Sequence, residues 1–207
     1  MRKTFFILLS FALVAGAAVA QEEGFEAIFN GKNLDGWAIQ GLEKAGPKVQ
    51  EDGVLAVDGW DYWAVITKKQ YGDFILRFDC KFDAKGNSGI ILTTAVKEAF
   101  KKELFEIQLA ADPGEVDKKT TGALFTPKGS FQAADKNPTK AIGEWNSVEV
   151  KYQGKKLTLV INGETVYDNL DLTQFEDLKL ADKFHIGIQR NDYKKAAYFK
   201  NIRVKEL

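Results

Sequence analysis

Cysteine and histidine are almost absent from this sequence. Its 207 residues include one Cys, one His and one Met, with only four Pro. A single Cys excludes an intramolecular disulfide, so packing alone must stabilise the chain. One His and one Cys also exclude the familiar zinc motifs, such as HExxH or paired CxxC.

Charge of one sign is not in excess either. The 29 Lys and Arg residues balance the 29 Asp and Glu residues. Because phosphate binding needs a net basic surface, we predict no nucleic-acid partner. The sequence also lacks a GxSxG elbow, a P-loop and a dinucleotide-binding glycine motif.

An apolar segment opens the chain. The basic pair Arg2-Lys3 precedes an almost wholly apolar run, and Ala18-Val19-Ala20 fits the small-x-small cleavage signal. We interpret 1–20 as a signal peptide and 21–207 as a single domain, whose net charge would be −2 without the leader. The expectation is a periplasmic or secreted protein with no membrane span after signal removal.

Period-two alternation of apolar and polar residues dominates the rest of the chain, and long helical patterns are missing. Alternation and turn signals predict strands at Gly53–Val57, Ala64–Thr67, Asp73–Ala84, Gly89–Thr94, Glu103–Ala110, Gly122–Phe125, Ser147–Tyr152, Lys156–Ile161, Glu164–Tyr167, Phe184–Gln189 and Ala197–Lys205. The clearest turn signal is Asn162-Gly163, which favours a type I′ hairpin.

About eleven strands in one domain imply an all-β fold of two packed antiparallel sheets, a jelly-roll sandwich. Short helical turns are expected at Thr94–Lys102 and Leu172–Leu178. The polar stretch Pro127–Ile142 is expected to be a long loop, of the kind that often serves as a lid or binding loop. Phe25–Phe29 is expected to form an edge strand beside the C-terminal strand.

The segment Leu104–Leu109 carries the main candidate for chemistry. Its odd-numbered residues are apolar and can enter a core, which leaves Glu106 and Gln108 together on the other face. If that face lines a cleft, Glu106 can act as a base and Gln108 can fix a polar ligand. If it is open to solvent, the pair has no such meaning.

The segment Phe184–Gln189 repeats this arrangement. Phe184 and the two Ile residues share one face, whereas His185 and Gln189 share the other, with Gly187 between them. A glycine inside a strand leaves room for the close approach of a ligand. We therefore predict His185 and Gln189 as substrate-binding residues, with a satisfied or surface histidine as the alternative.

A third polar face belongs to Arg77, Asp79 and Lys81. A charged stripe usually faces solvent, but on a concave sheet Arg77 could bind a hydroxyl or a carboxylate. Cys80 has the parity of the apolar residues around it and is interpreted as a small buried hydrophobe.

The stretch 58–63 combines acids with aromatic rings. Trp60, Tyr62 and Trp63 could stack against a sugar, or they could pack a loop. We interpret Asp58-Gly59-Trp60-Asp61 as a turn, although such carboxylates are also a weak signal for calcium. No cofactor is predicted, and a divalent metal stays an open alternative.

Nine motifs, in order, resemble those of the 3-keto-disaccharide hydrolase domain family, from about Gly24 to Leu207. They are Phe29-Asn30-Gly31-Lys32-Asn33-Leu34-Asp35-Gly36-Trp37, Tyr71-Gly72-Asp73-Phe74-Ile75-Leu76-Arg77, Asn87-Ser88-Gly89-Ile90, Phe105-Glu106-Ile107-Gln108, Gly122-Ala123-Leu124-Phe125, Glu144-Trp145-Asn146, Asn162-Gly163, Ile186-Gly187-Ile188-Gln189 and Phe199-Lys200-Asn201-Ile202-Arg203-Val204.

This resemblance implies a concanavalin A-like jelly roll and an exported enzyme that acts on an oligosaccharide or an oxidised glycoside. A ketone at sugar C3 acidifies the C2 proton, so one base can start an elimination that hydration completes. The family motif puts that base at Glu106, with Gln108, Asn87 and Gln189 as hydrogen-bonding partners.

The alternative is a jelly-roll protein that binds carbohydrate without cleaving it, because this architecture serves both purposes. It is favoured where the chain departs from the family pattern. Arg190-Asn191-Asp192 follows Gln189 where Asp-His-Gly is usual, Thr93 stands in place of an Arg, and Phe125 in place of a Tyr. The oligomeric state is not indicated by the sequence.

Overall fold

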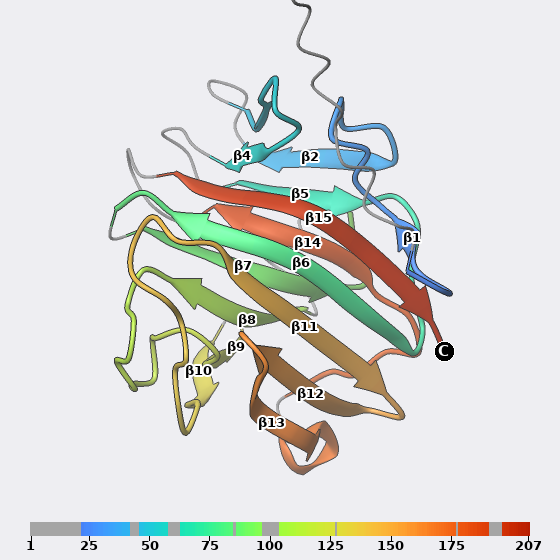
Figure 1. Ribbon diagram of the computed structural model, residues 1–207. Helices are drawn as coiled ribbons and strands as arrows, with labels where there is room; N and C mark the ends of the chain where they lie inside the picture. The colour runs from blue at the N-terminus through green and yellow to red at the C-terminus, as the bar shows by residue number, and fades with distance from the viewer. Residues whose placement is uncertain are drawn as a thin grey trace, which may run out of the picture.

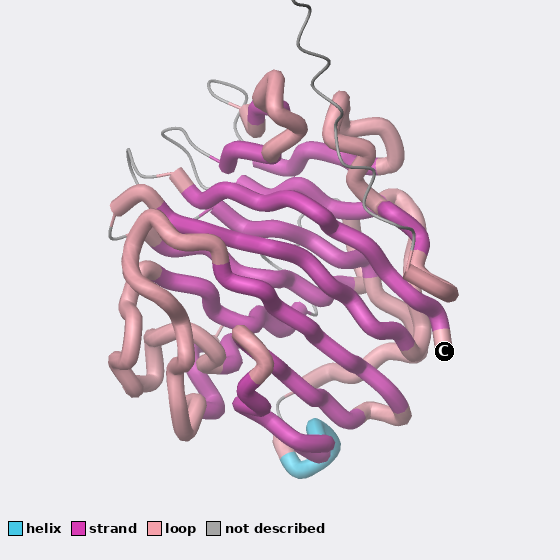
Figure 2. Tube along the Cα trace, in the orientation of Figure 1, coloured by secondary structure: helices cyan, strands magenta, loops and turns pink. Residues whose placement is uncertain are grey.

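The computed structural model describes residues 22–41, 46–57, 63–84, 86–96, 104–126, 128–176, 178–190 and 196–207. Nearly all regular structure in these ranges is β-strand, arranged as two antiparallel sheets that face each other (Figures 1 and 2). The prediction of an all-β, two-sheet sandwich is confirmed. The expected signal peptide lies outside the described residues and stays a prediction.

Each sheet has a defined spatial order of strands. The first runs β13 (Glu164–Asp171), β12 (Lys156–Ile161), β11 (Asn146–Gln153), β6 (Phe74–Phe82), β15 (Ala197–Glu206), β4 (Leu55–Val57) and β3 (Lys48–Val49), with β1 (Glu26–Ala27) also beside β15. The second runs β10 (Gly129–Gln132), β9 (Leu124–Thr126), β8 (Leu104–Ala110), β7 (Asn87–Thr93), β14 (His185–Arg190), β5 (Trp63–Thr67) and β2 (Trp37–Gly41).

The core lies between the two sheets and is rich in aromatic rings. Along β6 every second residue is buried, from Phe74 to Phe82. Phe184, which is fully buried, makes edge-to-face contacts with Phe105 of the second sheet and Tyr152 of the first, at centroid distances of 6.0 and 5.4 Å. These rings therefore join the inner faces of the two sheets.

Several local predictions are confirmed. Asn162 and Gly163 have φ angles of 52° and 82°, as a type I′ turn requires, and they join β12 to β13. A 3-10 turn, η2 (Leu172–Gln174), lies at the start of the helical turn expected at Leu172–Leu178 and is capped by Asp171, whose carboxylate accepts from the Thr173 amide. β1 pairs with β15, so the edge strand does lie beside the C-terminal strand.

Three short strands were not expected from the sequence. β10 falls inside the predicted loop Pro127–Ile142, where it forms a hairpin with β9. β3 has only two residues, which are too few to show an alternating pattern of apolar and polar side chains. β2 lies at a sheet edge and keeps Ile39 57% exposed, so it does not show a uniformly apolar face. Most of the helical turn expected at Thr94–Lys102 lies outside the described residues.

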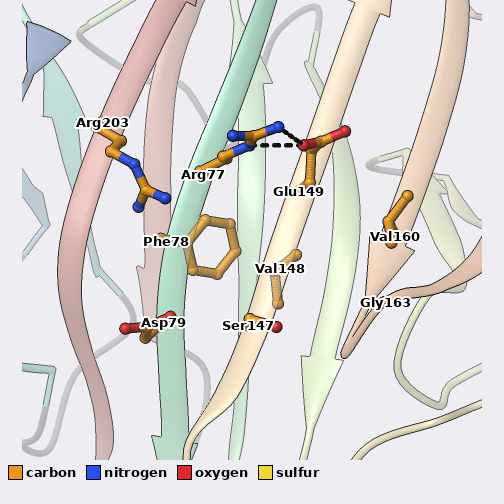
Figure 3. A pocket seen from close by; sticks show the side chains of 9 residues that line it. All are labelled: Arg77, Phe78, Asp79, Ser147, Val148, Glu149, Val160, Gly163 and Arg203. Carbon is orange, nitrogen blue, oxygen red and sulfur yellow. Dashed lines mark hydrogen bonds and ion pairs between the residues drawn. The ribbon is translucent and has the colours of Figure 1, made fainter. Parts of the chain in front are cut away.

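The outer face of the first sheet carries an ionic network (Figure 3). Arg77 and Arg203 are directly opposite on β6 and β15, a repulsive arrangement unless an anion lies between them. Glu22 supplies that anion, since its carboxylate binds Arg77 and also Arg203, the latter at 3.1 Å. Both guanidinium groups lie over the Phe25 ring, and Arg77 also binds Glu149 at 2.6 Å.

Loss of the negative charge at Glu22 should loosen this network. We expect Glu22→Gln to lower the free energy of unfolding by about 0.5–1 kcal/mol in low salt, as is usual for partly exposed ion pairs. The difference should shrink at high salt because of screening. Urea unfolding measures it, with Glu23→Gln on the exposed neighbouring residue as the control. Equal midpoints for Glu22→Gln and wild type in low salt would contradict this role.

Candidate active site

Glu106 lies on the face of the second sheet that points away from the sandwich core. Its neighbours Phe105 and Ile107 belong to the core cluster, so alternation directs Glu106 to the opposite face. The residue is nevertheless only 8% exposed. Glu106 is therefore a buried carboxyl group on an outer sheet face, as the strand pattern allowed but did not require.

The carboxyl group of Glu106 lies across the backbone of β7 and reaches β14. Gln189 Nε2 donates to Glu106 Oε2 at 2.7 Å. Gly89, on the strand between them, is the Cα partner of both Gln108 and Gln189. A Cβ atom at Gly89 would lie 2.7 Å from Cγ and 2.8 Å from Cδ of Glu106. The carboxyl group thus occupies the space that any other side chain at this position would fill.

Burial controls the protonation of this group. Burial raises the pKa of Glu106 to about 8, and the hydrogen bond from Gln189 opposes that rise. Glu106 Oε1 and Asn87 Oδ1 are buried and have no hydrogen-bond partner in the part of the chain that the structure describes. A buried carboxyl group that titrates near neutrality, with one oxygen that no described residue hydrogen-bonds, has the properties of a general base.

Gln108 shares this face but already has a structural partner. Its side-chain Nε2 donates to the main-chain oxygen of Lys119 at 3.0 Å. Its main chain also exchanges hydrogen bonds with Gly122 and Ala123. In this structure Gln108 therefore holds the segment before β9, and its predicted contact with a ligand stays a prediction.

His185 lies on the same face but away from Glu106. It is separated from Gln189 by four residues along β14, about 13 Å. Its Nδ1 lies 2.8 Å from the main-chain oxygen of Thr67. A Cβ at Gly187, between the two, would meet the side chains of Ile66 and Ile91. The space expected for a ligand at Gly187 is therefore filled by these Ile residues, and His185 is not brought to Glu106.

Arg77 belongs to the other sheet and is not brought to Glu106, so its predicted contact with a hydroxyl or a carboxylate stays a prediction. It lines a pocket of about 300 Å³ with Asp79, Glu149 and Arg203 on the outer face of the first sheet (Figure 3). Alternation along β6 predicts which residues share a face, but it does not say which sheet the strand joins.

The aromatic candidates are only partly described. The backbone of Trp63 lies in β5, opposite Arg190 and Gly41, and its side chain lies outside the described part of the structure. Trp60, Tyr62 and the Asp58–Asp61 stretch also lie outside it. The predicted stacking role of these rings therefore stays a prediction.

Two residues of the site were not assigned a role from the sequence. Gly89 provides the space for Glu106, and the buried Ser88 hydroxyl donates to the main-chain oxygen of Gln189. A glycine inside a strand is a signal of close approach, and the same rule applied to Gly187 could have singled out Gly89. The sequence pattern contains no signal that predicts the hydrogen bond from Ser88 to Gln189.

Other reactive groups lie elsewhere. Cys80 is buried in the core, and burial raises the pKa of its thiol to about 12, which suits a packing role better than a nucleophile. Within the described ranges, no three His, Cys, Asp or Glu residues come together as a metal site would require. No helix in those ranges is long and apolar enough to cross a membrane.

Solved structures similar to this chain are jelly rolls. A crystal structure provisionally assigned as a glycosyl hydrolase, from Parabacteroides distasonis ATCC 8503, is 25% identical with a TM-score of 0.72, and the match covers 89% of this chain and 94% of that one. The carbohydrate binding module CBM66 from Bacillus subtilis is 10% identical (TM-score 0.60; 83% and 96% covered). A Bacillus subtilis protein with a galectin-like fold is 12% identical (TM-score 0.61; 88% and 94% covered).

The last two similarities show the fold alone. A search of curated proteins found no significant match. A family match, in contrast, extends over residues 24–205, which is nearly all of the chain that follows the expected signal peptide. It includes Asn87, Gly89, Glu106 and Gln189. The chain therefore belongs to the 3-keto-alpha-glucoside-1,2-lyase-like domain family.

Proposed function

We propose that this protein is an exported enzyme that cleaves 3-keto-glycosides, with Glu106 as the base. The observation that carries the proposal is the state of the Glu106 carboxyl group. It is buried, its pKa is raised to about 8, and one of its oxygens has no hydrogen-bond partner among the described residues. Membership of the family supports the substrate class.

The chemistry needs one base and no second carboxylate. Glu106 removes the proton at C2, which the C3 ketone acidifies, and the resulting electron pair forms an enolate. The enolate then expels the C1 oxygen, so that the C1–O bond breaks and a C1=C2 bond forms. The leaving group takes up a proton from water, and Glu106 returns to the solvent the proton that it removed. Water adds across C1=C2, with OH at C1 and H at C2, which amounts to hydrolysis. Direct glycoside hydrolysis would instead require a carboxyl pair.

Two buried acceptors would orient the sugar. Asn87 Oδ1 and Glu106 Oε1 come from adjacent strands and lie on the same face of the second sheet. A buried acceptor without a donor costs about 1–3 kcal/mol, which a sugar hydroxyl could recover on binding. We therefore expect Asn87 to accept from a hydroxyl group while Glu106 faces the C2 proton.

The function is tested by incubating the protein with 3-keto-trehalose or a 3-keto-glucoside in D2O and following the 3-keto sugar by NMR. Elimination followed by hydration should place one deuterium at C2 of the product when it is observed early. Product that keeps its C2 hydrogen would overturn the elimination route. No turnover across a panel of 3-keto-glycosides would overturn the enzyme itself.

The pH dependence follows from the protonation of Glu106. Only the ionised carboxylate can accept the C2 proton, and with a pKa of about 8 roughly one tenth of it is ionised at pH 7. We expect kcat/KM to rise with pH from 6 and to level off above about 8. Initial rates, with circular dichroism to verify folding at each pH, measure this. A profile that is flat from pH 6 to 9 would contradict the assignment.

A second candidate function is carbohydrate binding without cleavage. It is favoured because His185, the one histidine of the sequence, lies at the main-chain oxygen of Thr67 and is not placed as a partner acid for Glu106. In that case calorimetry should detect binding of unoxidised glycans, Glu106→Gln should leave the affinity unchanged, and 3-keto-glycosides should not turn over.

A further inference from the structure

We propose that Gly89 and Gln189 are positioning residues that fix the Glu106 carboxyl group so that Oε1, not Oε2, meets the substrate. This inference rests on the proposed function for its catalytic meaning. Its structural part, the mutual dependence of Gly89 and Glu106, can be measured without any activity.

The first argument is space. Gly89 lies in the middle of β7 with ladder partners on both sides, and its φ angle is outside the left-handed region, so the backbone itself does not require glycine. A Cβ atom there would lie 2.7 and 2.8 Å from Cγ and Cδ of Glu106, and closer still to Oε1. Any side chain at position 89 would therefore displace the carboxyl group.

The second argument is orientation. Gln189 Nε2 donates to Oε2 of Glu106 at 2.7 Å, which engages that oxygen. Gln189 is itself buried, and its main-chain oxygen accepts from the Ser88 hydroxyl on the neighbouring strand. With Oε2 engaged, Oε1 is the oxygen without a partner among the described residues. A fixed base of this kind avoids the cost of reorganisation during proton transfer.

Gly187 provides a matched control. It also lies inside a strand of the second sheet, on β14, two residues from Gln189. A Cβ atom at Gly187 would lie 3.3 Å from atoms of Ile66 and Ile91, and its three nearest atoms belong to Ile66, Ile91 and Val65 instead of Glu106. Gly187→Ala therefore crowds the same sheet face without crowding the carboxyl group.

A double-mutant cycle on thermal stability tests the space argument. We expect Gly89→Ala to lower Tm by roughly 3–10 °C in the wild type, because it overpacks the site. In a Glu106→Ala background the same change should lower Tm by less than about 2 °C, since the crowded atoms are gone. An equal fall in both backgrounds would overturn the inference, whatever the protein's activity.

Kinetics with a 3-keto-glucoside test the catalytic part. Gly89→Ala should lower kcat about 100-fold because of the displaced base, whereas Gly187→Ala should stay within about threefold of wild type. Gln189→Met removes the donor that lowers the pKa of Glu106, so the pH at which kcat/KM levels off should move upward. An unchanged profile for Gln189→Met, or equal losses for the two glycine variants, would overturn the positioning role.

Discussion

Replacing Glu106 by Gln is expected to lower kcat/KM for a 3-keto-glucoside by about 10³-fold, within the range that a lost general base costs. The amide has the size of the carboxyl group but cannot accept the C2 proton. Initial-rate assays at pH 8, where Glu106 is about half ionised in the wild type, measure the effect. Equal turnover by the variant and the wild type would remove Glu106 from its role as the base.

The same substitution should make the folded protein more stable at neutral pH. Because the pKa of Glu106 rises from 4.5 to about 8 on folding, the folded state holds a proton that the unfolded state releases. Stability therefore falls as pH rises through this window, by on the order of 3 kcal/mol at pH 7. The uncharged amide of the Glu106→Gln variant would carry no such penalty, so the difference in stability should vanish below about pH 4.

Glu106→Gln is expected to lower activity but to raise stability. This combination distinguishes loss of the base from misfolding, which would lower both. Urea unfolding of Glu106→Gln at pH 4, 6 and 8 measures the stability side. Glu164→Gln, at the exposed start of β13, is the matched carboxyl-to-amide control and should change neither quantity. A variant that is both inactive and less stable than wild type at pH 8 would contradict the argument from burial.

Truncating Phe184 to Ala should cause the largest loss of stability. Its ring is fully buried and contacts aromatic rings of both sheets, so removal leaves a cavity that neither sheet can easily fill. We expect a loss of about 4 kcal/mol, or a fall in Tm of roughly 8–16 °C for a domain of this size. Calorimetry measures the fall.

Two comparisons make this prediction specific. Ile39→Ala removes apolar side-chain atoms from an exposed position on β2 and should cost less than about 0.5 kcal/mol. Phe184→Leu retains part of the volume and should lose less than Phe184→Ala. Similar losses in the free energy of unfolding for Phe184→Ala and Ile39→Ala would show that the contacts of the Phe184 ring with the two sheets do not stabilise the fold.

Strand alternation made most of the fold predictable. β12 begins and ends where the sequence predicts, and the Asn162-Gly163 turn follows because few residues tolerate the positive φ angles it needs. For Glu106 the pattern indicated the correct face. The face of a strand is a local property, set by which neighbours are apolar, and such properties are readable along the chain.

Properties that depend on the order of strands within a sheet could not be predicted from strand alternation. Arg77 lies on a polar strand face as Glu106 does, yet β6 and β8 lie in different sheets. Gly89 acquires its role only because β7 lies between β8 and β14, which brings Glu106 and Gln189 over it. β10 was hidden because its four residues, which include Gly129, are too few and too polar to show alternation.

The places of β14 and β15 also have a consequence for biosynthesis. These two strands follow every other described strand along the sequence, yet each lies in the interior of its sheet, β14 between β7 and β5, and β15 between β6 and β4. Until they emerge from the ribosome, each sheet is divided into two separate groups of strands, and β1 has no strand to pair with among the described residues. Nascent chains that stop before β14 therefore cannot complete either sheet, and both sheets stay divided until β14 and β15 have been synthesised.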